Sequence, residues 1–430
     1  MNQSIIKAGT AIADITPPLE VGLLSSSIKG TYVMFESVRL PLKARVLVLE
    51  SGNELVAVVA LDLLALSNTS VGGWEQFKKG MSSIIPLHKI ILTCTHTHNA
   101  PESAGLSPLY LTDAYRNWLN ETQKVINHAI IQAVQSLQRC EVFYSVDILK
   151  GFSLQRRIST SNGIVMSDSV QPVSNELMQK QPIDHRVHTI RFKNGDKVLA
   201  TVVQAACHPV HEMCIPHISA EFPGELCAVL EASGKNGLPL FLNGAAGDIN
   251  PPTVSMGATD ARRHGEALAK VVTEQEGLRT DEWEVKSGYK EWQLSIRPEM
   301  SIMNKGDAVA RFNAISLGRL AIVFLPGEVF TETALAIEKA SPFAHTIVVG
   351  FSENNIGYVP TEQAFNEGGY EIGPGKWSFL PKGADKIITA KALELLQELH
   401  EEQYVSLVVN EKIKDEIIYT KNQNTNSEKL

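Results

Sequence analysis

Residues 89–101, KIILTCTHTHNAP, join an apolar strand pattern to a cluster of chemically reactive side chains. The run Lys89–Thr95 is rich in Ile, Leu and Thr, which is typical of a strand that is covered on both faces. Two histidines, His96 and His98, follow it directly and would share one side of an extended segment, because side chains alternate along a strand. The stretch therefore predicts a buried strand that ends in a functional site.

Strand-like segments of similar composition recur along the chain, at Ala44–Glu50, Leu55–Leu63, His188–Phe192, Val198–Cys207, Leu238–Leu242, Leu317–Leu325 and Thr346–Phe351. Helix-like periodicity lies between and after them, at Asp113–Gln138, Asp260–Thr273, Phe330–Ala340 and Asp385–His400. This alternation predicts an α/β fold. Because no repeat and no Pro/Gly-rich linker divides the chain, we expect one domain over residues 1–410 and a polar C-terminal tail over 411–430.

Composition and charge exclude several classes of protein. The 39 basic and 47 acidic residues give a net charge of −8, so the chain lacks the excess of positive charge that binds nucleic acid or an anionic membrane. Apolar runs such as Leu320–Leu325 fall far short of the roughly 20 residues of a spanning helix. No basic region followed by a long apolar stretch opens the chain, so we expect a cytoplasmic protein with a small-molecule substrate. The cysteines lack CxxC spacing, which favours reduced thiols.

Polar side chains also follow other predicted strands where these end. His208 comes after Val198–Cys207, and Glu328 comes after Leu317–Leu325. Sites in α/β sheets gather outside the carboxyl ends of strands, so we expect these groups to meet the two histidines of the first strand. Two imidazoles and one carboxylate suit Zn²⁺ with one position open for water, and such an ion supports hydrolysis at neutral pH.

Each of these signals has a second interpretation when it is taken alone. The two histidines of the HTH sequence are equally consistent with hydrogen-bonded residues at a strand end. A single histidine such as His208 is more often a packing residue, and Glu328 is a favoured acid near the start of a helix. The common placement of all of them at strand ends is what favours a metal site.

The chain resembles the neutral/alkaline (non-lysosomal) ceramidase superfamily. The resemblance rests on six matches spread over the chain: GTAIADITPP (Gly9–Pro18), THTHNAP (Thr95–Pro101), His208, NGAAGDINP (Asn243–Pro251), PGE (Pro326–Glu328) and YVPTEQAFNEGGY (Tyr358–Tyr370). It implies a ceramidase-like catalytic domain, with two stacked mixed β-sheets flanked by helical layers, and a zinc amidase activity.

The resemblance also implies roles for individual residues. The metal ligands of the family correspond here to His96, His208, Glu328 and Tyr358. His98 would lie beside the metal-bound water, and Tyr370 would support the developing oxyanion. Arg156 corresponds to a substrate-contacting arginine, although the local match around it is short.

One departure from the family concerns the substrate. Ceramidases carry Ser in the motif G-D-x-S-P, whereas this chain has Asn250 at that position. The amide of Asn250 can hydrogen-bond an oxyanion or orient a water but cannot act as a nucleophile. We therefore expect hydrolysis of an amide in a small polar substrate and not in ceramide. A metal-dependent esterase or lactonase, and an inactive metal-binding homologue, remain alternatives.

Several polar residues near these motifs receive supporting roles or none. Asp62 and Asp248 are expected to orient a histidine or loop amides. In the segment His217–Glu225 we expect Glu221 and Glu225 to be solvated loop acids. Three further histidines are expected to lie at the surface or to cap local structure: His211, His217 and His264.

Overall fold

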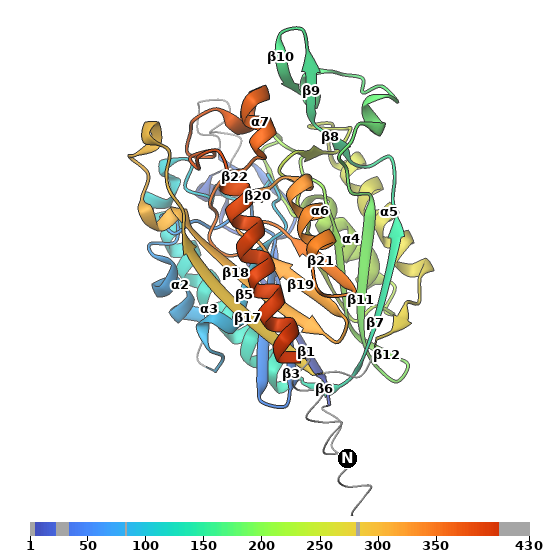
Figure 1. The fold of residues 1–430 in the computed structure, drawn as a ribbon. Coiled ribbons are helices and arrows are strands. Elements are labelled where there is room, and N and C mark those ends of the chain that lie inside the picture. Colours follow the sequence, from blue (N-terminus) through green and yellow to red (C-terminus); the bar gives the residue numbers. More distant parts are fainter. Residues whose placement is uncertain (1–4, 23–33, 82–83, 281–283, 404–430) are drawn as a thin grey trace, which may run out of the picture.

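Three mixed β-sheets form the centre of the part of the chain that the computed structural model describes, residues 5–22, 34–81, 84–280 and 284–403 (Figure 1). The first sheet contains, in order, Ile90–Cys94 (β5), Glu54–Leu61 (β4), Lys43–Ser51 (β3), Lys7–Asp14 (β1) and Gln138–Arg139 (β6). The second contains Leu238–Asn243 (β14), Lys197–Ala205 (β12), Arg186–Asn194 (β11), Glu141–Ile148 (β7) and Leu278–Arg279 (β16). The third contains Val285–Gln293 (β17), Val309–Leu317 (β18), Leu320–Phe324 (β19) and His345–Val349 (β21).

The three sheets stack as two layers with an apolar core between them. The second and third sheets meet edge to edge, because Gly350 N–H after β21 donates to Asn243 O at the end of β14 (2.9 Å). Side chains from all three sheets fill the space between the layers, among them Leu47, Phe192 and Ile322. Removal of this apolar surface from water holds the layers together.

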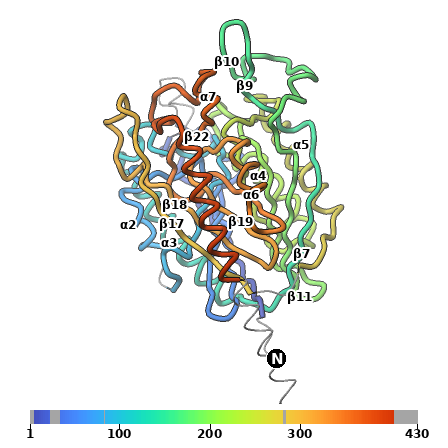
Figure 2. The backbone as a smooth tube through the Cα atoms, in the orientation of Figure 1, coloured from blue at the N-terminus to red at the C-terminus, as the bar shows by residue number. Residues whose placement is uncertain are grey.

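Helices cover the outer faces of both layers. Trp74–Met81 (α2) and Asp113–Gln135 (α3) pack on the first sheet, and Glu221–Ala232 (α4) and Ala258–Glu274 (α5) pack on the second. Thr331–Ala340 (α6) and the helix over residues 384–403 cover the third sheet. Figure 2 shows the helix over 384–403 in red, crossing β18 and β19. The predicted arrangement of two stacked mixed sheets between helical layers is confirmed.

Short two-stranded ladders and one short helix complete the described residues. The ladders are Ser37–Leu40 (β2) with His217–Ser219 (β13), Leu154–Gln155 (β8) with Ile249–Asn250 (β15), Arg157–Thr160 (β9) with Gly163–Met166 (β10), and Glu328–Val329 (β20) with Tyr358–Val359 (β22). The short helix is Glu362–Glu367 (α7). As Figure 1 shows, β20, β22, β8 and α7 gather at one end of the molecule.

Most buried strands follow the apolar runs of the sequence, but β18 was predicted only at its last residue, Leu317. The single strand predicted over Leu317–Leu325 is two strands, because β18 ends at Leu317 and the chain turns at Gly318, whose φ is 66°. Glycine adopts this left-handed conformation without the steric cost of a side chain. The sequence analysis also missed β7 and β17, in which partly exposed polar residues interrupt the apolar pattern.

The prediction of solvated acids in His217–Glu225 is wrong. Glu221 begins α4 and is fully buried, and its two carboxylate oxygens accept the backbone N–H groups of Glu212 and Phe222. Burial, together with the neighbouring Glu212 carboxylate, raises the pKa of Glu221 to about 8. Glu225 pairs with Arg39 at 2.6 Å. These acids hold α4 and its surroundings together and do not face solvent.

Other expectations concern thiols, membranes and the tail. Cys94, Cys140, Cys207 and Cys227 are buried free thiols, as predicted. No helix among the described residues has the length and apolar character needed to cross a bilayer. The predicted tail over 411–430 lies outside the described residues.

A buried ion pair ties β5 to the segment that follows β21. Both carboxylate oxygens of Glu353 accept from Lys78 Nζ (3.0 and 2.8 Å), and Glu353 also accepts from Leu92 N–H in β5 (3.0 Å). Nearby, Cys94 N–H donates to Phe351 O (3.0 Å). The last residues of β5 are thereby held against the third sheet.

Replacement of Lys78 by Met should lower the free energy of unfolding by about 3–5 kcal/mol, because it leaves the Glu353 carboxylate buried without its cation. The matched control is Lys124→Met, which removes an exposed pair with Glu121 and should cost less than about 1 kcal/mol. Denaturant midpoints of the two variants measure the difference. Equal midpoints for the two variants contradict the role assigned to the buried pair.

Candidate metal centre

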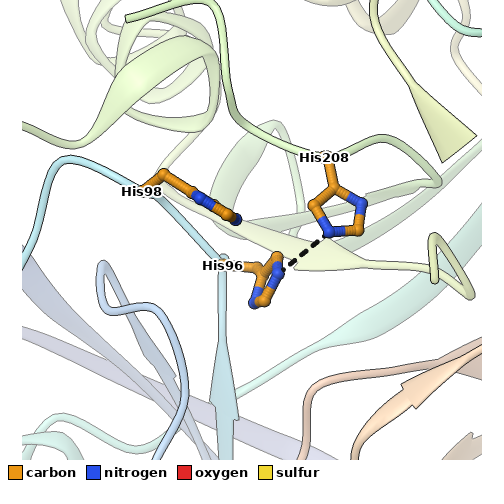
Figure 3. Close-up of side chains that lie close together, drawn as sticks. All are labelled: His96, His98 and His208. Atoms are coloured by element: carbon orange, nitrogen blue, oxygen red, sulfur yellow. Dashed lines mark hydrogen bonds between the residues drawn. The ribbon is translucent and has the colours of Figure 1, made fainter. Parts of the chain in front are cut away.

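Residues that follow the carboxyl ends of three strands meet at one end of the molecule. His96 follows β5, His208 follows β12, and Glu328 lies in β20 just after β19. His96 has a φ of 70°, which directs the chain away from the strand immediately after β5. Figure 3 shows His96 and His98 on one loop, facing His208 on another. The predicted convergence of strand ends is therefore present.

Three acceptor atoms from these residues lie within hydrogen-bond distance of one another. The distances are 3.1 Å between His96 Nε2 and His208 Nε2, 3.2 Å between His208 Nε2 and Glu328 Oε2, and 3.4 Å between His96 Nε2 and Glu328 Oε2. A tetrahedral zinc ion with bonds of about 2.0–2.1 Å separates its ligands by roughly 3.3–3.4 Å. We call these three residues the acceptor cluster, and its spacing fits three ligands of one metal ion.

The other ring nitrogens determine which histidine atoms carry protons. His96 Nδ1 lies 2.7 Å from Leu64 O, and His208 Nδ1 lies 2.7 Å from Ala246 O. A carbonyl oxygen accepts only a protonated nitrogen, so each Nδ1 carries the hydrogen and each neutral ring has a lone pair on Nε2. Two imidazole lone pairs and a carboxylate oxygen then face one another, an arrangement that a cation stabilises.

Electrostatics act on the protonation of His208 and Glu328. Burial, reinforced by the Arg156 guanidinium, lowers the pKa of His208 to about 4. Burial raises the pKa of Glu328, and a proton on either adjacent imidazole, His96 or His208, lowers it well below its usual range. Neutral imidazoles and an ionised carboxylate are the species that ligate divalent metals.

His98 joins this group without taking part in its hydrogen bonds. Ligand nitrogens of His96, His98 and His208 all lie within 4.8 Å of one another, so the three histidines form a buried group able to hold a metal ion. Neither ring nitrogen of His98 has a hydrogen-bond partner among the described residues. Burial and the two neighbouring histidines lower the pKa of His98 well below its usual value. Its nitrogens are available to a metal, a water or a substrate.

The two predicted tyrosines lie beside the cluster. Tyr358 pairs with Glu328 in the β20–β22 ladder and is buried, so the two side chains emerge from neighbouring backbone positions. Tyr370 is half-exposed, and its ring centroid lies 5.8 Å from that of Tyr358. Burial raises the pKa of Tyr358 well above its usual value and that of Tyr370 to about 12.

Arg156 and Asn250 lie behind the cluster. Arg156 Nη1 is 3.4 Å from both His208 Nε2 and Asn250 Oδ1, and its guanidinium lies 5.3 Å from the ring centroid of Tyr358. Arg156 Nε donates to Glu371 Oε1 at 2.8 Å, whereas its Nη2 is buried with no hydrogen-bond partner in the described part of the chain. Neither residue lines the cavity described next.

A cavity of about 410 Å³ opens above the acceptor cluster. It lies in the size range of small-molecule sites. The residues that line it come from the segments that follow β4, β5, β19, β21 and α7: Leu64, Ala65, His96, His98, Ala104, Leu106, Glu328, Asn355, Tyr358, Tyr370, Lys376 and Trp377. His96 and Glu328 of the cluster, His98 and both tyrosines therefore share one accessible space, whereas His208 does not line it.

Two residues with clear roles at the site were missed in the sequence analysis. The ring of Phe351 stacks on His96 with centroids 4.0 Å apart, and Glu371 accepts from both Arg156 and Arg157 (2.8 and 2.5 Å). Phe351 was assigned only to a strand, and Glu371 lies in a glycine-rich loop with no periodic pattern. Their contacts are tertiary, and no spacing in the sequence indicates them.

Asp62 and Asp248 orient backbone amides, as predicted. Asp248 accepts from Thr331 N–H and Asp62 accepts from Lys43 N–H, both at 2.9 Å. The other histidines lie away from the cavity: His211 bonds His264 at 3.0 Å, and His217 bonds Glu212 at 2.5 Å. Contrary to expectation, His211 and His264 are buried and not at the surface.

Comparison with known proteins identifies the fold. No model of a protein family matches the sequence, and no curated protein sequence matches it either. Among solved structures, the neutral ceramidase from Pseudomonas aeruginosa is 17% identical with a TM-score of 0.73, covering 93% of this chain and 75% of its own. A structure described as a ceramidase complexed with C2 is 16% identical with a TM-score of 0.74, covering 93% of this chain and 76% of its own. The chain therefore has a ceramidase-like fold, as its sequence motifs predicted.

Proposed function

We propose that the protein is a zinc-dependent hydrolase that uses water to cleave the amide bond of a small polar N-acyl substrate. The observation that carries this proposal is the acceptor cluster, in which three lone pairs converge beside an accessible cavity that His96 and Glu328 line. His96, His208 and Glu328 would hold the ion, and Tyr358 would be the fourth protein ligand. A bound zinc ion supplies a water with a pKa near 7 and polarises a carbonyl oxygen.

His98 is the group best placed to move protons. It is neutral near pH 7, and both of its ring nitrogens are free of hydrogen bonds to the described residues. A free ring nitrogen accepts a proton from an attacking water and returns it to the leaving nitrogen of the amide. An amide needs this second transfer because an unprotonated amine anion is a poor leaving group.

Donors near the cavity would stabilise the negative charge that develops on the carbonyl oxygen. Tyr370 lines the cavity, and a pKa of about 12 keeps its hydroxyl protonated and able to donate. Arg156 is positioned behind the cluster, where its charge would stabilise an ionised Tyr358. Asn250 would act through its contact with Arg156.

The size of the cavity and Asn250 both favour a small substrate over ceramide. A volume of about 410 Å³ holds a molecule of modest size. Asn250 replaces the serine of the ceramidase motif G-D-x-S-P, and the direct attack of water does not depend on that serine.

The proposal is tested by metal analysis together with hydrolysis of matched amides and esters. The wild type should contain about one zinc per chain and cleave N-acyl amides, and His96→Ala and Glu328→Gln should lose the metal and more than about 100-fold of kcat/KM. His128→Ala, at an exposed position on α3, is the control and should retain both. A folded, zinc-free wild type whose turnover equals that of both variants contradicts the proposal. Faster cleavage of esters than of matched amides supports an esterase instead.

His98 should be separable from the ligands by experiment. His98→Ala should lower kcat by about 10²–10⁴-fold while the zinc content stays at the wild-type level, because a general base is lost and the acceptor cluster is intact. Zinc content and single-turnover rates measure the two effects separately. A loss of zinc in this variant would instead make His98 a ligand, in line with its place in the three-histidine group.

A further inference from the structure

The cavity contains a cation that the proposed chemistry does not use. Lys376 lines the cavity together with Trp377, on the loop that also carries Tyr370. Its side chain is exposed, and among the described residues its ammonium group forms no hydrogen bond or ion pair, although it interacts electrostatically with the buried carboxylate of Asp307, which Thr69 holds by hydrogen bonds. An exposed lysine without a hydrogen-bonded partner at the wall of a binding cavity is able to pair with a ligand.

The carboxylates near the cavity are already committed to other groups. Glu328 is the one acid among the described residues that line the cavity, and its Oε2 belongs to the acceptor cluster. Behind the site, the guanidinium groups of Arg156 and Arg157 share the buried carboxylate of Glu371. The second acid near Arg157 is Glu367, which is partly exposed and more distant at 3.4 Å. Among the described residues that line the cavity, Lys376 is therefore the one lysine or arginine, and the one acid belongs to the acceptor cluster.

Part of the cavity wall is apolar. Leu64, Ala65 and Ala104 form a small buried cluster, against which Leu106 packs. All four residues line the cavity. On the side of Lys376, the rings of Tyr370 and Trp377 stack nearly parallel, with centroids 5.5 Å apart. The wall of the cavity thus includes an apolar part and an aromatic, cationic part.

We infer that Lys376 selects anionic substrates, namely small amides with an apolar group on one side of the scissile bond and a carboxylate on the other. Electrostatic pairing with Lys376 would bind the carboxylate, and the apolar group would pack against Leu64 and Leu106. Turnover of these substrates rests on the proposed function, whereas the preference in binding requires no reaction.

The carboxylate of such a substrate lies on either the amine side or the acyl side of the amide bond, and matched compounds distinguish these two cases. N-butyrylglycine carries it on the amine side, N-propylsuccinamate carries it on the acyl side, and N-butyrylethanolamine is a neutral counterpart. The zinc-loaded wild type should prefer one of the two anionic amides over the neutral one by about tenfold or more in kcat/KM. Lys376→Met should abolish this preference, whereas Lys376→Arg should retain it. Lys235→Met, at an exposed position after α4, is the matched control and should behave as the wild type.

A binding measurement separates this inference from the proposed function. Calorimetric titration of the metal-free protein with the same three compounds should show about tenfold tighter binding of an anionic amide, lost in Lys376→Met and weakened by salt. Equal affinity for neutral and anionic compounds, or an undiminished preference in Lys376→Met, overturns the inference. If the wild type binds the anionic amide preferentially but cleaves none of the three, the proposed hydrolysis fails and the inference stands.

Discussion

Mutual repulsion of three acceptor atoms is the constraint around which this end of the molecule is built. His96 Nε2, His208 Nε2 and Glu328 Oε2 approach within 3.1–3.4 Å, although none of them has a proton to share with the others. The protein keeps them together from behind, since each imidazole is anchored by a hydrogen bond from Nδ1 to a backbone carbonyl. Such an arrangement is pre-organised for a cation and unfavourable without one.

The anchors depend in turn on strained backbone held by buried contacts. His96, Phe351 and Glu353 all have positive φ values, of 70°, 51° and 53°. Each such residue costs about 1–3 kcal/mol and persists only where its surroundings determine its conformation. Here the surroundings are the stack of Phe351 on His96 and the bonds of Glu353 to Lys78 and to β5. Stability of the core and geometry of the site are therefore coupled through one short segment after β21.

Charge is distributed unevenly around the cavity. Arginines lie near the cluster and share a buried carboxylate, while Lys376 lies on the wall. In a site partly removed from water, such charges act more strongly than they would at the surface. The chain shares its fold with solved ceramidases at 16–17% identity, and its cavity combines apolar residues such as Leu64 with the cation of Lys376.

The sequence by itself predicted the α/β class, because strands buried on both faces must be apolar throughout and helices on the outside must be amphipathic, and its resemblance to ceramidases implied the two stacked sheets. It also indicated His96, His208 and Glu328, because polar residues directly after buried strands are unusual and carry chemistry. It failed at α4, where Glu221 looked like a solvated acid but is buried by tertiary hydrogen bonds. Only the tertiary structure decided which ring nitrogens face one another, that Arg156 lies behind the site, and that Lys376 lines the cavity. These properties arise from contacts between segments more than a hundred residues apart, such as that of Arg156 with Glu371, for which local patterns contain no signal.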